Sequence, residues 1–270
     1  MPMFYTKKKV GLFYEVLNPQ EEKTVAFFNG VMASTLSWDS QSTLFARMGY
    51  RVILHDFKGQ LLSEKPQGPY TFKEHAKEAL ELFEFLNVQK VHLVGTSYGG
   101  EVAMRFALDY PKHTKTLSVI DSVSQLDEVL KFFLMQWKEL ALQEDPERFF
   151  WSMLPSIYGN SFIQNNLDLL KERAKMLQLA NKDYFKGQVA LYDTFLNDLN
   201  MTKELPTIKN PVLIVCGQED ILKPVKFSKI MAKAIPHAEW IEIPDCGHVT
   251  ILEKPHTLNS MLLGFIAKHQ

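Results

Sequence analysis

The residue whose type and setting point most directly to chemistry is a serine framed by glycines. Ser97 lies at the centre of residues 95–99 (Gly-Thr-Ser-Tyr-Gly), which join an apolar run to a helical pattern. Glycines two residues to either side leave room for a turn so sharp that the serine side chain stands exposed at its tip. Such a nucleophile elbow places the serine at a helix N-terminus, where negative charge is stabilised. The pattern therefore predicts a nucleophilic serine.

A serine hydroxyl attacks a carbonyl only with the help of an adjacent base, which a third group orients. Of the eight histidines, His248 comes directly after a predicted strand, in a loop that can carry it to the strand C-termini. The orienting acid has three candidates at strand ends, namely Asp220, our first choice, its neighbour Glu219, and Asp121. Under the alternative interpretation, Glu219 and Asp121 are each a surface or capping residue.

The elbow, the strand before it and the helix after it resemble the α/β-hydrolase family, and the resemblance extends over nearly the whole chain. It implies the chain order serine, acid, histidine, which Ser97, Asp220 and His248 keep. Gly217 and Asp220 also keep the spacing of the family's Gly-x-x-Asp segment. The resemblance therefore favours Asp220 over Glu219 as the acid.

An acyl-transfer site also needs N–H donors for the oxyanion of its tetrahedral intermediate. One is expected directly after the nucleophile, at Tyr98, and the other in the loop after the first buried strand, at Val31. Two departures from the family pattern lie nearby. Asn29 replaces a common histidine, in which it is similar to enol-lactonase-like members, and its amide can brace the loop by hydrogen bonding. Leu61 replaces a glycine and does not readily adopt positive φ, so we expect its loop to take a different path.

These residues need a frame of strands whose C-terminal ends meet at one edge of a sheet. Apolar runs alternate with helical patterns through the first 121 residues, which indicates right-handed strand–helix–strand crossovers. Residues 4–17 predict an antiparallel hairpin at the sheet edge. The expected fold is α/β, a mostly parallel doubly wound sheet. Its parallel strands are predicted at 24–28, 51–55, 91–94, 116–120, 211–217 and 238–243, and its helices at 38–48, 72–83, 102–110, 225–235 and from about 255.

Between residues 122 and 205 the alternation stops and the pattern is helical throughout. A structureless loop of that length is uncommon in a compact domain, so this segment is predicted to be a helical cap or lid over the strand C-termini. Residues 1–121 and 206–270 then form the core. The cap helices are expected at 126–142, 146–153, 162–179 and 184–199. Aromatic side chains that either line a pocket or hold the cap together are Trp137, Phe149, Phe150, Trp151, Phe162, Phe185, Tyr192 and Phe195.

Composition argues against several classes of partner. Lys and Arg total 30 against 31 Asp and Glu, a formal net charge of −1, so no overall field favours nucleic acid or an anionic membrane. Signal-peptide and membrane-spanning patterns are absent, and a cytoplasmic location is expected. Cys216 and Cys246 are too few for a disulfide framework and match no zinc spacing. Buried free thiols are favoured over a redox pair.

The sequence therefore predicts a serine hydrolase that acts through an acyl-enzyme, without a metal or organic cofactor. The expected substrate is a small or medium, mostly apolar carboxylic ester, lactone or thioester. Carbon–carbon bond hydrolases and cofactor-free perhydrolases resemble the family and keep the same three residues. A ligand-sensing protein of the same fold is the alternative from another functional class. Because fold does not fix function, the sequence leaves the substrate open, and it leaves the oligomeric state open as well.

Overall fold

The structure is a computed structural model that describes residues 2–179 and 182–270. Within these residues the centre is an eight-stranded sheet in the order β1-β2-β4-β3-β5-β6-β7-β8. The pairs β1–β2 and β2–β4 are antiparallel, and every other neighbouring pair is parallel. The predicted α/β class and the edge hairpin are confirmed. The strands are β1 (Met3–Tyr5), β2 (Gly11–Leu17), β3 (Thr24–Phe28), β4 (Arg51–His55), β5 (Val91–Thr96), β6 (Thr114–Ile120), β7 (Val212–Gly217) and β8 (Glu239–Ile243).

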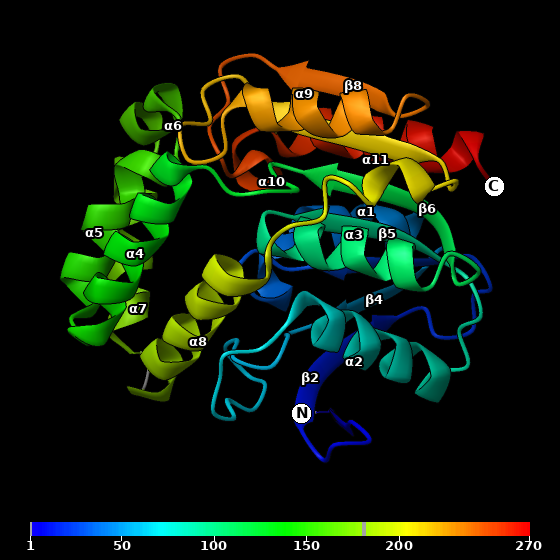
Figure 1. Ribbon diagram of the computed structural model, residues 1–270, viewed down its shortest axis with the longest axis horizontal. Helices are drawn as coiled ribbons and strands as arrows, with labels where there is room; N and C mark the ends of the chain where they lie inside the picture. The colour runs from blue at the N-terminus through cyan, green and yellow to red at the C-terminus, as the bar shows by residue number, and fades with distance from the viewer. Residues whose placement is uncertain (1, 180–181) are drawn as a thin grey trace.

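The sheet separates two hydrophobic cores, because successive side chains of a strand point to opposite faces. In β3, Ala26 and Phe28 join the core that contains α2, α3 and α9, whereas Val25 and Phe27 join the core that contains α1 and α11. β3, β5 and β7 are buried along their whole length, as expected for strands covered on both faces. The core helices (Figure 1) are α1 (Asp39–Arg47), α2 (Phe72–Phe85), α3 (Tyr98–Asp109), α9 (Val225–Ala234), α10 (Thr250–Glu253) and α11 (Pro255–Lys268).

The start of α2 illustrates how local sequence sets an element. The Thr71 hydroxyl accepts from the Glu74 backbone N–H at 3.0 Å, and the Glu74 carboxylate accepts from the Thr71 N–H at 3.2 Å. This reciprocal capping box satisfies two N–H groups that have no acceptor within the helix. It confirms the helix start expected from the sequence.

A helical insertion separates β6 from β7 and groups at one end of the sheet (Figure 1). One prediction here is wrong, because the single helix expected at 162–179 is two helices that meet at Asn166. The side chains of Asn165 and Asn166 donate to the carbonyls of Ser161 and Phe162, both at 2.9 Å, and so compete with helical hydrogen bonding. The helices are α4 (Glu128–Leu142), α5 (Pro146–Ile157), α6 (Asn160–Asn165), α7 (Leu167–Gln178) and α8 (Lys182–Asp198).

Of these helices, α8 is fastened to the core most directly. The Thr194 hydroxyl accepts from the Tyr70 N–H at 2.8 Å, and the Asp198 carboxylate accepts from the Phe72 N–H at 2.7 Å. A side chain at Gly187 would meet the Gly59 carbonyl oxygen at 2.0 Å, so helix and loop backbones approach closely there. The insertion is therefore attached to the loop between β4 and α2. Among the described helices, none combines the length and apolar character needed to cross a bilayer.

Candidate active site

Ser97 occupies a strained turn between β5 and α3, with φ 51° and ψ −123°. A left-handed conformation is uncommon for a residue other than glycine and is typical of a nucleophile elbow. Gly95 and Gly99 are required because other backbone atoms lie too close to both positions to leave room for a side chain. A Cβ at Gly95 would lie 2.3 Å from the Gly99 carbonyl oxygen, and a Cβ at Gly99 would lie 2.0 Å from the Phe28 carbonyl oxygen. The tight turn thus packs against the end of β3.

Three of the residues singled out in the sequence form one hydrogen-bonded chain. His248 Nε2 lies 2.9 Å from Ser97 Oγ, and His248 Nδ1 lies 2.7 Å from Asp220 Oδ2. The second Asp220 oxygen accepts from the backbone N–H groups of Leu222 and Lys223, at 2.9 and 2.8 Å. These two bonds fix the carboxylate, so that it can accept from Nδ1–H and leave Nε2 free to take a proton from the serine.

The surroundings of His248 favour its protonated form. Burial lowers the pKa of the imidazole, but the charge of Asp220 and its hydrogen bond raise that pKa above the ordinary value. Both side chains are buried. A histidine whose pKa is raised in this way is suited to accept a proton during attack and to hold it until a leaving group departs.

Neither of the two alternative acids forms a hydrogen bond with the His248 ring. Glu219 is half-buried, while Asp121 is fully buried, so of the surface and capping roles that the sequence suggested for Asp121, the surface role is wrong. Asp121 accepts from the Gly217 N–H at 2.9 Å and from the Thr250 N–H at 3.2 Å. Burial and the charge of Asp220 raise the pKa of Asp121 to about 7. Asp121 thus joins the loop that carries the acid to the loop that carries the histidine.

The loop expected to supply an oxyanion donor lies beside Ser97. A Cβ at Gly30 would be in van der Waals contact with the Ser97 Cβ, at 3.4 Å, so the loop backbone lies directly beside the elbow. The Val31 carbonyl accepts from the Gln188 side chain of α8 at 3.2 Å. Tyr98, the other expected donor, is the first residue of α3, where N–H groups have no acceptor within the helix.

Asn29 braces this loop, as the sequence suggested. Its amide nitrogen donates to the His55 carbonyl and to Asp56 Oδ1, both at 2.9 Å. Its amide oxygen accepts from the Trp38 indole N–H at 2.9 Å. Gln60 completes the network by donating to the Gly30 carbonyl at 2.7 Å. A buried, satisfied polar network of this kind holds the loop in one conformation.

The sequence reasoning missed a buried ion pair that contacts the nucleophile. Lys223 Nζ lies 3.2 Å from Ser97 Oγ and 3.1 Å from each carboxylate oxygen of Glu101. The two side chains are 2% and 0% exposed. Burial lowers the pKa of Lys223, and the charge of Glu101 opposes that shift. One signal was available, since Glu101 is a charged residue among the apolar positions of α3 and lies one helical turn after Ser97.

The loop that carries His248 is also tied to the helical insertion. The His248 N–H donates to the carbonyl of Ile157, the last residue of α5, at 2.9 Å. The Glu253 carboxylate accepts from the N–H groups of Gly247, at 2.9 Å, and Gly159, at 3.2 Å. The end of α5 therefore supports the histidine loop directly at the His248 N–H, and through Glu253 the residue before the histidine is linked to Gly159.

Ser97 and His248 open into a cavity of about 660 Å³ between the sheet edge and the insertion. Its walls are mainly apolar, and among the described residues that line it Arg173 is the one permanent charge. The Arg173 guanidinium donates to the Tyr158 hydroxyl at 2.9 Å. Trp137 and Phe150 line the cavity. The other lining residues are Gly30, Val31, Met32, Ala33, Ser34, Leu36, Ser37, Leu61, Thr96, Leu154, Ile157, Met176, Leu177, Leu179, Tyr184, Val249, Ile251 and Leu252.

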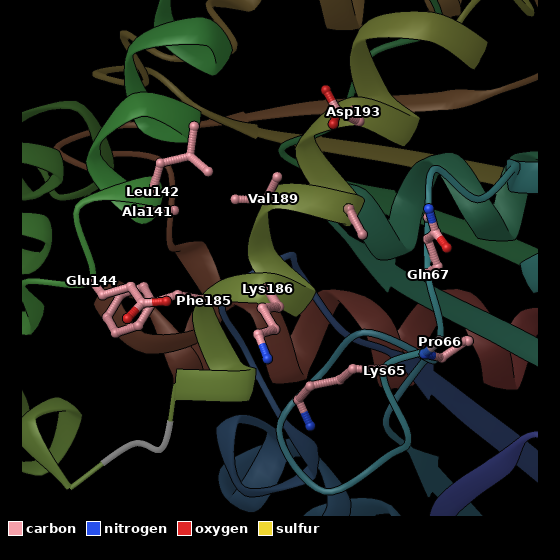
Figure 2. A pocket seen from close by; sticks show the side chains of 12 residues that line it. Lys65, Pro66, Gln67, Ala141, Leu142, Glu144, Phe185, Lys186, Val189 and Asp193 are labelled. Carbon is pink, nitrogen blue, oxygen red and sulfur yellow. The ribbon is translucent and has the colours of Figure 1, made fainter.

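A second cavity, of about 470 Å³, lies between the loop after β4 and helices α4 and α8 (Figure 2). Phe185, which the sequence suggested as a pocket aromatic, lines this cavity instead. Lys65 of the loop and Lys186 of α8 extend into the space between the two elements in Figure 2. Ser97, His248 and Asp220 do not line it, so it is separate from the site around the serine.

Neither cysteine is part of this arrangement. Cys216 and Cys246 are buried free thiols, which confirms the favoured interpretation. Burial raises the pKa of Cys216 to about 11 and raises that of Cys246 further, so both thiolates are disfavoured. Within residues 2–179 and 182–270, no cluster of three His, Cys, Asp or Glu side chains is placed to hold a metal ion.

Comparison with known proteins agrees with this fold. A sequence model described as the alpha/beta hydrolase fold matches residues 23–255. The chain is 26% identical over 263 residues to RutD of Pantoea ananatis, which bears the provisional name of a carbamate hydrolase; the match covers 95% of this chain and 94% of that protein. It is 25% identical over 273 residues to the bifunctional esterase/perhydrolase DCH of Acinetobacter calcoaceticus, covering 97% and 98%. MGS-M2, an alpha/beta hydrolase enzyme from a Medee basin deep-sea metagenome library, superposes with a TM-score of 0.92 at 27% identity, covering 98% and 97%.

Proposed function

The chain belongs to the α/β-hydrolase fold family, and from this basis we propose that it is a serine hydrolase that cleaves carboxylic esters, lactones or thioesters. The observation that carries the proposal is the hydrogen-bonded chain Ser97–His248–Asp220 at the wall of a mainly apolar cavity. A serine, a base that contacts it and an acid that orients the base are the parts that acyl transfer needs.

In the proposed reaction, Ser97 Oγ attacks the substrate carbonyl while His248 Nε2 takes the hydroxyl proton. Asp220 keeps the proton on Nδ1 and stabilises the imidazolium that forms. The backbone N–H groups of Val31 and Tyr98 stabilise the oxyanion. His248 then returns its proton to the leaving group, which yields an acyl-enzyme. Water attacks the acyl carbon with His248 again as the base, and the acid product leaves.

The walls of the cavity support a small or medium, mostly apolar substrate. A cavity of about 660 Å³ lies within the range of small-molecule sites, which are mainly apolar with a few placed polar groups. We propose that the insertion acts as a lid, because α5 and α7 supply lining residues opposite the serine and would shield the acyl-enzyme from water.

A perhydrolase activity is the second candidate, since the relative from Acinetobacter carries both names. The same acyl-enzyme would be attacked by hydrogen peroxide in place of water, so the residues and their roles stay the same. Comparing acid with peracid production from one ester, with and without added peroxide, separates the two activities.

The decisive experiment is active-site labelling. A fluorophosphonate probe should label the native protein once, on the peptide that contains Ser97, and Ser97→Ala should abolish labelling. The same variant should lose about 10⁵- to 10⁶-fold in kcat on a chromogenic ester. Ser37→Ala is the matched control, because Ser37 lines the same cavity without contacting His248. Labelling elsewhere, or none on the folded protein, would overturn the assignment.

Turnover separates the enzyme from a ligand sensor of the same fold. A panel of p-nitrophenyl esters graded by acyl-chain length should give repeated turnover with a defined optimum, set by the apolar cavity. Tight ligand binding without more than one turnover on any member would favour the sensor instead.

A further inference from the structure

We propose that Lys223 is a catalytic residue whose ammonium group promotes release of the serine oxygen when the acyl-enzyme is hydrolysed. This inference rests on the proposed function and adds a participant to it. It begins from the contact between Lys223 Nζ and Ser97 Oγ, the atom that forms and breaks the covalent bond, at 3.2 Å.

The ammonium group is held so that one hydrogen is left for the nucleophile. Lysine has three N–H donors, and each Glu101 carboxylate oxygen lies 3.1 Å from Nζ. Glu101 is itself fixed, because its Oε1 also accepts from the Val123 N–H at 2.8 Å. The third donor direction is the one that meets Ser97 Oγ.

The environment strengthens this contact. Lys223 is buried, and the Phe195 ring lies 4.6 Å from Nζ, where the ring face stabilises the cation. In a buried site of low polarity, hydrogen bonds from a charged donor are stronger than those at the surface. Glu101 balances the charge, so the effect of Lys223 is local and acts through its hydrogen bond to Oγ.

This hydrogen bond affects the two halves of the reaction differently. During acylation, Oγ begins as a hydroxyl oxygen that already accepts from the Lys223 N–H, so this hydrogen bond gains only a little strength as Oγ attacks the substrate carbon. In the acyl-enzyme, Oγ is an ester oxygen and a weaker acceptor, so the same hydrogen bond gains more strength when that oxygen is released. During deacylation, the C–Oγ bond breaks, its electron pair returns to Oγ, and His248 delivers the proton that water supplied. Lys223 keeps its own protons and stabilises the negative charge that develops on Oγ. The products are the free serine hydroxyl and the carboxylic acid.

Lys223→Met removes the donor and keeps an unbranched chain of similar length. Loss of a hydrogen bond from a charged donor should slow deacylation by about 10- to 100-fold and should slow acylation less. With p-nitrophenyl butyrate in stopped flow, the variant should release a burst of nitrophenol close to one equivalent and then turn over slowly. Intact-protein mass spectrometry should show the butyryl adduct accumulating at steady state.

Two further variants separate chemistry from packing. Lys223→Met alone leaves Glu101 buried without its partner. The double variant Glu101→Gln, Lys223→Met removes that unpaired charge. In this variant the Gln oxygen still accepts from the Val123 N–H. If Lys223 serves only to pair with Glu101, the double variant should regain the wild-type rate of deacylation. If Lys223 acts on Ser97 Oγ, the double variant should show the same burst as Lys223→Met. Lys226→Met is the matched control, because Lys226 is an exposed partner of Asp127.

Fluorophosphonate labelling provides an independent measurement, because it reports attack by Oγ without deacylation. Both variants that lack Lys223 should lose less in labelling rate than in deacylation rate. Equal slowing of burst and steady-state phases, or a wild-type deacylation rate in the double variant, overturns the inference. Absence of any adduct on Ser97 in the wild type would instead overturn the proposed function itself.

Discussion

The sheet edge and the helical insertion contribute to the same cavity but are built differently. The serine, acid and histidine follow β5, β7 and β8, and β5 and β7 are buried throughout. The insertion, in contrast, leaves many large apolar side chains exposed: Val129, Phe132, Met135, Leu142, Leu167, Leu169, Met176 and Leu179. Groups that must hold a fixed geometry thus stand on the most constrained part of the chain, and the walls that meet the substrate stand on the least constrained part.

The largest effect is expected when the charge of Asp220 at the sheet edge is removed. Asp220→Asn keeps the shape of the side chain but loses the charge and the tautomer control, so kcat should fall by about 10⁴-fold, or roughly 5 kcal/mol. The double variant with His248→Ala should be hardly worse than His248→Ala alone, because the residues act as a unit. Glu219→Gln is the control and should stay within about tenfold of the wild type. Equal losses of kcat in Asp220→Asn and Glu219→Gln would refute the assignment of Asp220 as the acid.

Substitutions in the sheet should also lower the free energy of unfolding more than substitutions on the exposed face of the insertion. Leu93→Ala, at a fully buried position of β5, should lower the free energy of unfolding by about 2–5 kcal/mol, because it leaves a cavity in a packed core. Phe132→Ala, on a side chain of α4 that is 67% exposed, should change it by no more than about 0.5 kcal/mol. Urea unfolding followed by circular dichroism measures both. A larger loss at Phe132 would mean that this face is covered in solution.

Amide hydrogen exchange can divide the insertion further. Backbone amides of α6 and α7 should exchange faster than those of β5 and β7, because buried strands open only with the core. α8 should be intermediate, since Thr194 and Asp198 accept from core N–H groups. Exchange measured by mass spectrometry on overlapping peptides resolves these elements. Uniform protection would remove the distinction between a mobile lid and a stable core.

The smallest expected effect concerns pH. The base acts when neutral, so kcat/KM should fall as pH drops through the His248 pKa, and Asp220 raises that pKa above the ordinary histidine value of about 6.5. The charge of Asp121 also raises it, so Asp121→Asn should move this acid limb to lower pH, by less than about one unit because no hydrogen bond joins that carboxylate to the ring. A shift to higher pH would contradict this electrostatic account.

Much of the fold could be predicted because its signals are local. Buried strands are continuous apolar runs, the elbow is a short glycine pattern, and Thr71 and Glu74 cap α2 within one turn. Ser97, His248 and Asp220 were candidates because each follows a recognisable strand. The charged Glu101 among the apolar positions of α3 was a signal for a buried partner, but it did not identify Lys223, since the two residues are 122 positions apart and meet only after the sheet has formed.

Other features could not be predicted from the sequence, for related reasons. The break between α6 and α7 depends on asparagine side chains that compete with the helix, which apolar periodicity does not register. The burial of Asp121 depends on backbone N–H groups from two distant loops. Contacts that satisfy a buried polar group are tertiary, so a residue-by-residue interpretation does not reveal that the group is buried.

The hydrogen bond between the His248 N–H and the Ile157 carbonyl has a consequence for recombination among relatives. A chimera that replaces residues 122–205 with the cap of another family member also replaces the backbone that supports the histidine loop. Crossovers placed at those boundaries would therefore alter substrate preference and the alignment of the base together. Grafts that retain residues 157–159 of the recipient, with Gly159 still bonded to Glu253, would exchange the cavity walls alone.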